Sequence, residues 1–411
     1  MEAAEDSCAR WRPSCGRGTI TGAVRSVYLD HSATSPALPE VVDAVRHALE
    51  RVHGNPASLH RLGVEAERFL EEARSTVAAG LGAEPPEVVF TSGGTEANNL
   101  AVFGVAWARS SPHVIVSAFE HSSVLEPARR LRQLGVQVDF LPVDRDGFVR
   151  LDALADLLRP NTALVSVVLV NNEVGTLQPV AQVAALLDEA ESRWGRRPLL
   201  HTDAVQALGH VPFRVRDLRA DLVTVSAHKL GGPKGVGALY VRRGVHLQPS
   251  VLGGDQERGL RGGTPNLPGI AGFAAALRFW TEQGDRLRGV LRALWAKLRA
   301  ELASCPDVRW NTPAEEQRTA PHILNLSVPG LRGEVLVHRL EEDGVYVSTG
   351  SACHSRRAHP SHVLLAMGRT EVEATSAVRL SLGPSTTDED VAYAAQALKA
   401  ALEDLRPLVQ R

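Results

Sequence analysis

The chain of 411 residues carries 45 lysines and arginines against 47 aspartates and glutamates, so its formal net charge is −2. This length is enough to bury a large core and predicts two domains. Without a broad basic field we expect no nucleic-acid partner. Without an apolar run near the ~20 residues of a membrane helix, we expect no membrane span.

The first 26 residues are polar and lack apolar periodicity, which predicts a disordered N-terminal extension, 1–26, without a secretory signal. Its arginines at positions 10, 12, 17 and 25 are typical of an organellar transit peptide. Its acidic residues Glu2, Glu5 and Asp6 are not, so organellar targeting by this extension stays open.

Helix-like and strand-like segments alternate from about residue 65 onward. Apolar residues at helical spacing predict a helix from Val64 to Leu81 that ends at Gly82. The short apolar runs 114–116 and 164–170 predict strands that are buried on both faces, and 180–191 predicts a crossover helix. This order is typical of a mainly parallel sheet.

The pattern changes after Gly269. A long helix rich in Ala and Arg is predicted over 272–302, and alternation over 322–328 predicts a half-buried strand. A terminal helix is predicted from Thr387, a candidate N-cap, to Leu405. We expect an α/β fold with a large domain over 27–275, whose first ~15 residues return to the small domain, and a small α+β domain over 276–411.

A strand-like segment, 87–90, leads into Ser92-Gly93-Gly94-Thr95 and then into a helical pattern. The free N–H groups and the dipole of a helix N-terminus favour a phosphate at such a turn. An ordinary turn in which Thr95 caps the helix is the alternative.

Asp203 ends the apolar run 198–202, and Gln206 lies three residues further on. A carboxylate at the carboxyl edge of a sheet can keep a pyridine nitrogen protonated, although helix capping is the alternative for Asp203. His121 is a candidate to stack on such a ring or to move protons, and a structural histidine is its alternative.

Lys229 follows the strand-like run 222–225 and precedes a glycine-rich loop, 231–235. Lysine bonds covalently to carbonyl carbons, including the aldehyde of pyridoxal phosphate. A solvated surface lysine is the alternative for Lys229 taken by itself. The ordered set of a phosphate turn, a ring-nitrogen partner and a lysine predicts pyridoxal 5'-phosphate as the cofactor.

These motifs resemble those of class V aminotransferases and, within that family, cysteine desulfurases of the NifS/IscS type, from Val27 to about Thr387. Further matching motifs are 54–60, 171–175, 253–259 and 261–264. The most diagnostic segment is Gly350-Ser351-Ala352-Cys353, followed by Pro360-Ser361-His362-Val363-Leu364. The resemblance implies fold type I of the pyridoxal-phosphate-dependent transferases, an α/β fold with a large, mainly parallel domain.

The resemblance also implies a role for each cofactor residue. Lys229 would hold the aldehyde covalently, Asp203 would pair with the pyridinium and Gln206 with the phenolic oxygen. His121 would stack on the ring and assist proton transfer. The implied phosphate ligands are Gly94, Thr95, Ser226, His228 and Thr264, the last from the partner subunit of a homodimer.

On the substrate side, the resemblance implies that Asn172 and Arg379 hold the carboxylate, since a guanidinium fork suits bidentate binding. Cys353 would be the nucleophile, whose thiolate takes the substrate sulfur as a persulfide. The small and polar residues around Cys353 predict a loop, whereas a buried apolar cysteine is the alternative.

Three functions are therefore weighed. The first is a cysteine desulfurase that converts L-cysteine to L-alanine and passes sulfur to an acceptor or scaffold protein, for iron–sulfur cluster or thio-cofactor biosynthesis. The second is a selenocysteine lyase acting on L-selenocysteine, and the third is a non-catalytic, partner-binding scaffold. His31, Leu230-Gly231, Asp255 and Pro384 depart from the family pattern and leave substrate preference and partner open.

The four cysteines and fifteen histidines show no CxxC pair and no HExxH motif, so we expect no metal site. Few cysteines at irregular spacing favour a reducing compartment, and the cytoplasm is the expected location.

Overall fold

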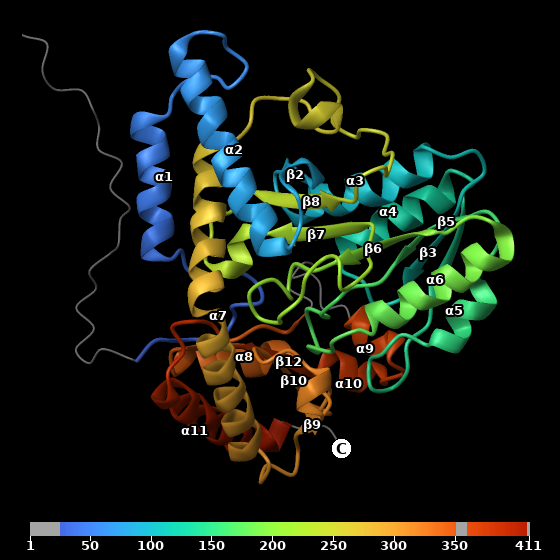
Figure 1. Cartoon of the computed structure of the whole chain (residues 1–411). Coiled ribbons are helices and arrows are strands. Elements are labelled where there is room, and N and C mark those ends of the chain that lie inside the picture. Colours follow the sequence, from blue (N-terminus) through green and yellow to red (C-terminus); the bar gives the residue numbers. More distant parts are fainter. Residues whose placement is uncertain (1–24, 351–359, 409–411) are drawn as a thin grey trace, which may run out of the picture.

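A seven-stranded sheet forms the centre of the computed structural model, which describes residues 25–350 and 360–408 (Figure 1). The strand order is β2-β8-β7-β6-β5-β3-β4, and only β8 runs antiparallel to its neighbours. Its strands are β2 (Val88–Thr91), β3 (His113–Ser117), β4 (Gln137–Leu141), β5 (Thr162–Ser166), β6 (Leu199–Asp203), β7 (Leu222–Ser226) and β8 (Gly237–Val241). The predicted α/β fold with a mainly parallel sheet is confirmed. The expected disordered extension, 1–26, lies almost entirely outside the described residues.

Helices cover both faces of this large sheet, as parallel strands require. On β3, Val114 and Val116 enter one apolar core while Ile115 enters the other. The first core is closed by α3 (Gly94–Trp107) and α4 (Ser122–Gln133). The second is closed by α2 (Arg61–Leu81) and α6 (Val180–Trp194), and α1 (Pro39–Arg51) and α5 (Leu151–Leu157) also contribute buried residues to it. The predicted helix that stops at Gly82 is α2, and Gly82 caps it at φ +69°.

A small antiparallel sheet lies beyond the large one, in the order β12-β10-β9. It consists of β9 (Arg309–Trp310), β10 (Ile323–Ser327) and β12 (Ala377–Ser381). The helices around it are α8 (Gly333–Glu342), α9 (His362–Ala366), α10 (Glu371–Thr375) and α11 (Asp388–Leu405). The N-terminal strand β1 (Val27–Tyr28) pairs with β11 (Val345–Tyr346), so the first described residues join the C-terminal part of the chain. Thr387 caps α11 as predicted.

One helix of 35 residues, α7 (Leu267–Glu301), connects the two sheets. In its first half Trp280 Nε1 donates to the carbonyl of Leu230, and in its second half Trp295 Nε1 donates to that of Ile323. The expected domain boundary between residues 275 and 276 falls inside this helix, which both sheets therefore share. The remaining single turns are η1 (Pro85–Glu87), η2 (Ala227–Leu230), η3 (Gln256–Gly259), η4 (Glu316–Arg318) and η6 (Arg406–Leu408).

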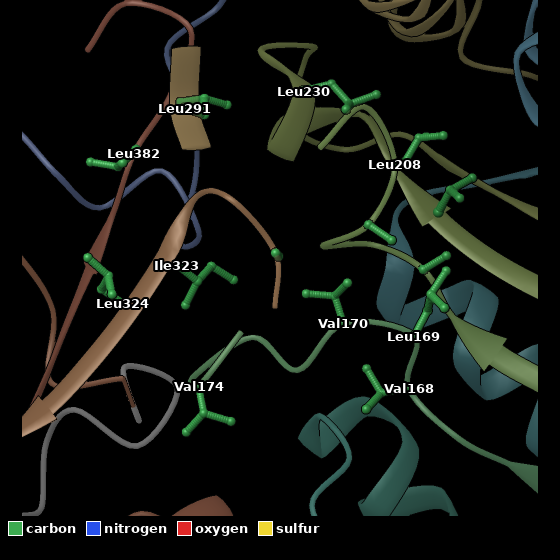
Figure 2. Packing of buried hydrophobic residues seen from close by; sticks show 14 of the residues in the cluster. Val168, Leu169, Val170, Val174, Leu208, Leu230, Leu291, Ile323, Leu324 and Leu382 are labelled. Atoms are coloured by element: carbon green, nitrogen blue, oxygen red, sulfur yellow. The ribbon is translucent and has the colours of Figure 1, made fainter. Parts of the chain in front are cut away.

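Strand β10 is buried along its whole length, so the prediction of a half-buried strand is wrong. Its polar side chains Asn325 and Ser327 are bonded by the amide of Asn311 rather than by water, at 2.8 and 2.7 Å. On the same face, Ile323 lies toward Val170 and Val174 of the large-sheet side (Figure 2). The alternating pattern marks the polar face correctly, but protein rather than solvent covers it.

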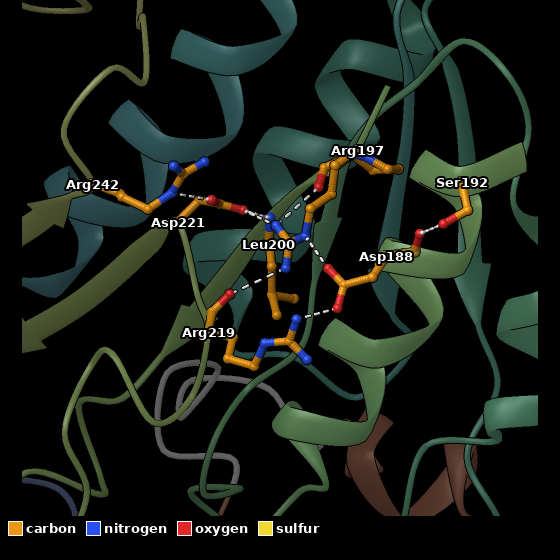
Figure 3. A network of polar contacts seen from close by, with 8 residues as sticks. Asp188, Ser192, Arg197, Leu200, Arg219, Asp221 and Arg242 are labelled. Atoms are coloured by element: carbon orange, nitrogen blue, oxygen red, sulfur yellow. Dashed lines mark hydrogen bonds and ion pairs between the residues drawn. The ribbon is translucent and has the colours of Figure 1, made fainter. Parts of the chain in front are cut away.

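The N-terminal edge of the large sheet is closed by a network of ion pairs (Figure 3). Asp221, 1% exposed, precedes β7 and accepts hydrogen bonds from Arg197, Arg242 and the N–H of Leu200 at 2.6 to 2.7 Å. Asp188 on α6 accepts from Arg197 and Arg219. These contacts fix the starts of β6 and β7, whose opposite ends carry the motifs of the predicted site.

Candidate active site

A cavity of about 310 Å³ opens at the carboxyl edge of the large sheet. Gly350, next to the small sheet, contributes to its wall. The predicted site residues that line it are Gly94, Thr95, His121, Asn172, Asp203, Gln206, Ser226, His228, Lys229 and Arg379. Thr264 is exposed and does not line it, and Cys353 lies outside the described residues. Ligands are expected at this edge of an open α/β sheet.

Lys229 sits in η2, the single turn that follows β7. Its Nζ donates to the carbonyl oxygens of Ser32 and Ala33, both at 2.6 Å. These carbonyls belong to the segment that β1 anchors to the C-terminal part of the chain. The amine is thereby held at the cavity wall by two backbone acceptors that the sequence motifs did not include.

Asp203 is the last residue of β6 and is 5% exposed. Its Oδ1 accepts from the N–H of Val205 at 2.9 Å within a turn, and not at the start of a helix, so the helix-capping alternative is wrong. Its Oδ2 accepts from Asn98 Nδ2 at 2.7 Å. Asn98 was missed by sequence reasoning. Its place four residues after Gly94, on the same face of the predicted helix, is the signal that could have found it.

His121 caps the N-terminus of α4, and its Nδ1 accepts from the N–H of Ser123 at 3.1 Å. Burial lowers the pKa of His121. Lys229 and His362 lower it further, while Asp203 opposes the shift. The imidazole is therefore neutral near pH 7, and because Nδ1 accepts a hydrogen bond, Nε2 carries the hydrogen.

Glu120, next to His121, is fully buried. Burial raises its pKa to about 8, and the charge of Asp203 adds to the shift. Its Oε1 accepts from Ser117 at 2.9 Å, and its backbone oxygen accepts from Nε2 of His362 on α9. A neutral Glu120 at pH 7 leaves Asp203 without a second negative charge behind it.

The turn before α3 is shaped to receive an anion. Gly93 precedes the helix at φ +151° and no side chain caps the helix, so the alternative in which Thr95 caps it is wrong. A Cβ on Gly94 would lie 2.9 Å from a methyl carbon of Val205, which restricts this position to glycine. His228 lies nearby on η2, and burial together with Lys229 and Lys234 lowers its pKa to about 4.

Arg379 on β12 is 2% exposed and enters the cavity from the small sheet. Its Nη1 donates to the carbonyl of Asn172 and its Nη2 to Asp30, both at 2.8 Å. Two fixed partners orient the guanidinium without using its Nε, which is buried and has no partner. Asn172 thus contributes its backbone to the site in addition to its predicted side chain.

Glu173, 2% exposed, lies beside Gly350 and Ser361, which flank the segment 351–359 on its two sides. Ser361 donates to its Oε2 at 2.5 Å, and a Cβ on Gly350 would lie 3.2 Å from the same oxygen. Gly350 has φ +82°, which favours glycine. Both flanks of the segment that contains Cys353 therefore meet at one carboxylate of the large-sheet side.

Four polar atoms of the cavity residues are buried without a partner: Ser32 Oγ, Gln206 Oε1, Asn98 Oδ1 and Arg379 Nε. Gln206 Nε2 donates to the carbonyl of Ser32 at 2.9 Å and keeps a second hydrogen. Buried polar groups are nearly always satisfied in folded proteins, so this concentration indicates a polar ligand.

Two classes of site do not emerge from the part of the chain that the structure describes. No three His, Cys, Asp or Glu side chains gather there as ligands for a metal ion. No helix in those ranges combines the length and the apolar character that a membrane crossing requires.

Comparisons with known proteins agree with the fold and the cavity. The model of the family Aminotransferase class-V matches residues 27–393. A curated relative, "Cysteine desulfurase IscS" of Dictyoglomus turgidum, is 41% identical over 93% of this chain and 96% of its own length. A solved "NIFS-LIKE PROTEIN" superposes with a TM-score of 0.86 at 37% identity, covering 93% of this chain and 100% of that one. The structure "SspA in complex with cysteine" gives a TM-score of 0.75 at 31% identity over 88% and 100%. The chain therefore belongs to the class V aminotransferase family and, within it, to the group of cysteine desulfurases of the IscS and NifS type.

Proposed function

We propose that this protein is a cysteine desulfurase, which converts L-cysteine to L-alanine and takes the sulfur as a persulfide on Cys353. One observation carries the proposal. An amine, a carboxylate and a guanidinium, those of Lys229, Asp203 and Arg379, line one cavity whose wall ends at Gly350, three residues before Cys353. The names of the relatives support the same activity.

The residues of the cavity fit pyridoxal 5'-phosphate as the cofactor. Lys229 would bond to its aldehyde carbon, Asp203 to its pyridinium nitrogen, and the second hydrogen of Gln206 Nε2 to its phenolic oxygen. Gly94, Thr95, Ser226 and His228 would hold its phosphate, with Thr264 from a partner subunit. When bound, the cofactor supplies an electron sink for the α-carbon of an amino acid.

The other residues bind substrate and move protons. Arg379, already oriented by Asp30 and the carbonyl of Asn172, would receive the substrate carboxylate together with the Asn172 side chain. His121 would stack on the ring and exchange a proton at Nε2. The Cys353 thiolate attacks the substrate sulfur: an S–S bond forms, the C–S bond breaks, and its electron pair stays on carbon, which is protonated on the way to alanine.

A homodimer is part of the proposal. Leu59 and Leu252 are 98% and 82% exposed, and both lie in loops that carry motifs of the family resemblance, as does the exposed Thr264. A subunit interface over these loops would remove both leucines from water. Sedimentation velocity of the wild type and of Leu252→Glu tests it: a dimer is expected for the first and dissociation for the second. A monomeric wild type would contradict the proposal.

The remaining assignments are also proposals. The persulfide would pass to an acceptor or scaffold protein, for iron–sulfur cluster or thio-cofactor biosynthesis. We place the protein in the cytoplasm, on the grounds of its cysteine usage. The division into a large and a small domain is kept, with α7 shared between the two.

The decisive experiment measures alanine formed from L-cysteine and from L-selenocysteine by the wild type and by Cys353→Ala. A desulfurase requires that the wild type uses L-cysteine and that the variant does not. Efficient turnover of L-selenocysteine alone would assign a selenocysteine lyase. Alanine from neither substrate would leave the non-catalytic scaffold. Cys305→Ala is the matched control and should behave as the wild type, because Cys305 does not line the cavity.

A further inference from the structure

We propose that Asn98 is a positioning residue that transmits the charge of Asp203 to His121 and thereby selects which nitrogen of His121 carries the hydrogen. Only the effect of Asn98 on turnover rests on the proposed function. The hydrogen-bond chain itself is a property of the folded protein.

The chain consists of four side chains from three elements. Asn98 on α3 is 1% exposed, and its Nδ2 donates one hydrogen to Asp203 Oδ2 at 2.7 Å and the other to Ser123 Oγ at 2.8 Å. Ser123 Oγ lies 2.7 Å from Nδ1 of His121. Asn98, Asp203, Ser123 and His121 all line the cavity, so the chain surrounds the place where a ring would lie.

The Asp203 carboxylate determines which group donates and which accepts in each hydrogen bond of the chain. A carboxylate can only accept hydrogen bonds, so Asp203 requires the amide nitrogen of Asn98 to face it. With both hydrogens of Nδ2 in use, Ser123 Oγ accepts from Asn98 and its own hydrogen remains for Nδ1 of His121. The neutral imidazole then carries its hydrogen on Nε2.

An unpaired atom supports this direction. Asn98 Oδ1 is buried and has no hydrogen-bond partner, so the amide sits in an orientation that leaves an acceptor unsatisfied. The opposite orientation would place this oxygen against the Asp203 carboxylate. The negative charge therefore determines how the amide lies, and Asn98 acts through its nitrogen rather than by filling space.

Several charged groups lie around His121, and Ser123 is the member of the hydrogen-bond chain that contacts its Nδ1. The charged or titratable side chains that act on it are Asp203, Lys229 and His362, with Glu120 beside Asp203. Ser123 contacts Nδ1 twice, with its hydroxyl at 2.7 Å and with its backbone N–H at 3.1 Å. If the chain is broken, Nδ1 loses the hydroxyl of Ser123 as a donor, and the preference for hydrogen on Nε2 weakens.

The test is ¹⁵N NMR of the cofactor-loaded protein labelled with ¹⁵N-histidine, without substrate. The protonated and unprotonated nitrogens of a neutral imidazole resonate far apart, and comparison with His121→Gln identifies the signals of His121. In the wild type Nδ1 should appear as the unprotonated nitrogen. In Asn98→Asp, which keeps the size of the side chain but replaces the donor with an acceptor, the Nδ1 signal should move toward the protonated position.

Two further variants separate a positioning role from a structural one. Ser123→Ala breaks the chain one step later and should move the same signal, even if Asn98→Asp fails to fold. Asn99→Ala is the control, because the neighbouring side chain donates to the backbone carbonyls of Thr95 and Ser123 and to no side chain of the hydrogen-bond chain, and it should leave the signal unchanged. An unchanged His121 signal in Asn98→Asp or in Ser123→Ala overturns the inference.

Kinetics give the second readout. Asn98→Asp should lower kcat for L-cysteine by about tenfold to a hundredfold with little change in KM, as expected when a positioned proton donor is disturbed. The ¹⁵N NMR spectrum is recorded without substrate and does not depend on turnover. A protein that shows the predicted Nδ1 signal but forms no alanine would therefore refute the proposed function and leave the hydrogen-bond chain standing.

Discussion

The two edges of the large sheet differ in how completely their charged and polar side chains are hydrogen-bonded. At the N-terminal edge, every carboxylate oxygen of Asp188 and Asp221 receives an N–H donor. In the cavity at the carboxyl edge, Asn98, Gln206 and, from the small sheet, Arg379 each leave one buried polar atom without a partner. The same strands connect the two edges, so the fold itself does not impose the difference. One edge is a completed structural network, and the other keeps binding capacity for a ligand.

This comparison separates what holds the protein together from what it binds. Substitutions at the N-terminal edge should change stability and leave the cavity intact. Substitutions at the carboxyl edge should change binding and turnover more than stability.

Lys229→Ala should have the largest effect. We expect loss of the cofactor's visible absorbance and a fall in alanine formation of roughly a thousandfold or more, because the covalent attachment is lost. The melting temperature without cofactor should change little. Lys234→Ala, in the same loop but exposed, is the control and should remain yellow and active. A yellow, active Lys229→Ala protein would remove Lys229 from the site.

Asp221→Asn tests the opposite edge. It removes a buried charge that pairs with two arginines, and we expect a loss of about 3 kcal/mol in the free energy of unfolding. Asp188→Asn, whose carboxylate is about one-third exposed, should lose about 1 kcal/mol or less. Urea denaturation measures both. A change in KM for L-cysteine in the Asp221→Asn variant would contradict the separation of the two edges.

Arg379→Lys should act on substrate binding. It keeps a positive charge near Asp30 but removes the planar fork, so KM for L-cysteine should rise roughly tenfold to a hundredfold while kcat changes less. Steady-state kinetics with L-cysteine measure the two constants. An unchanged KM would show that the substrate carboxylate binds elsewhere.

Glu120→Gln should have the smallest effect, and it depends on pH. The pKa of Glu120 is raised from 4.5 to about 8, so its contribution favours folding below the unfolded value and is lost as the pH rises toward 8. Buried histidines with lowered pKa, such as His201, act in the opposite direction, but they contribute equally to the wild type and to the variant. Relative to Glu120→Gln, the wild type should therefore lose up to about 1.4 kcal/mol of stability per pH unit between pH 7 and 8. Urea denaturation of both proteins at the two pH values measures this difference, and an equal change in both proteins would contradict the shift.

The sequence predicts the parts of the site that depend on local pattern. Asp203, Ser226 and Lys229 follow strands whose apolar runs are plain, and the rule that ligands bind at carboxyl edges brings them together. The sequence does not predict partners that only the folded chain brings near. Asp30 meets Arg379 across 349 residues, and the carbonyls of Ser32 and Ala33 meet Lys229 because β1 pairs with β11.

The sequence also does not predict which polar faces become buried. The alternation in β10 is real, but which face water reaches depends on what else packs there, and Asn311 lies against its polar face. Asn98 is similar: its position one turn after Gly94 indicates the face of the helix, but its partners Asp203 and Ser123 come from other elements that only the folded chain brings near.

The helix α7 has a mechanical consequence. Its 35 residues extend over about 52 Å, and a buried tryptophan in each half bonds to the backbone, in η2 after the large sheet and in β10 of the small sheet. Neither sheet can lose its packing without releasing part of this one rod. We therefore expect heating to unfold the chain in a single cooperative step, with equal calorimetric and van't Hoff enthalpies, rather than one sheet at a time.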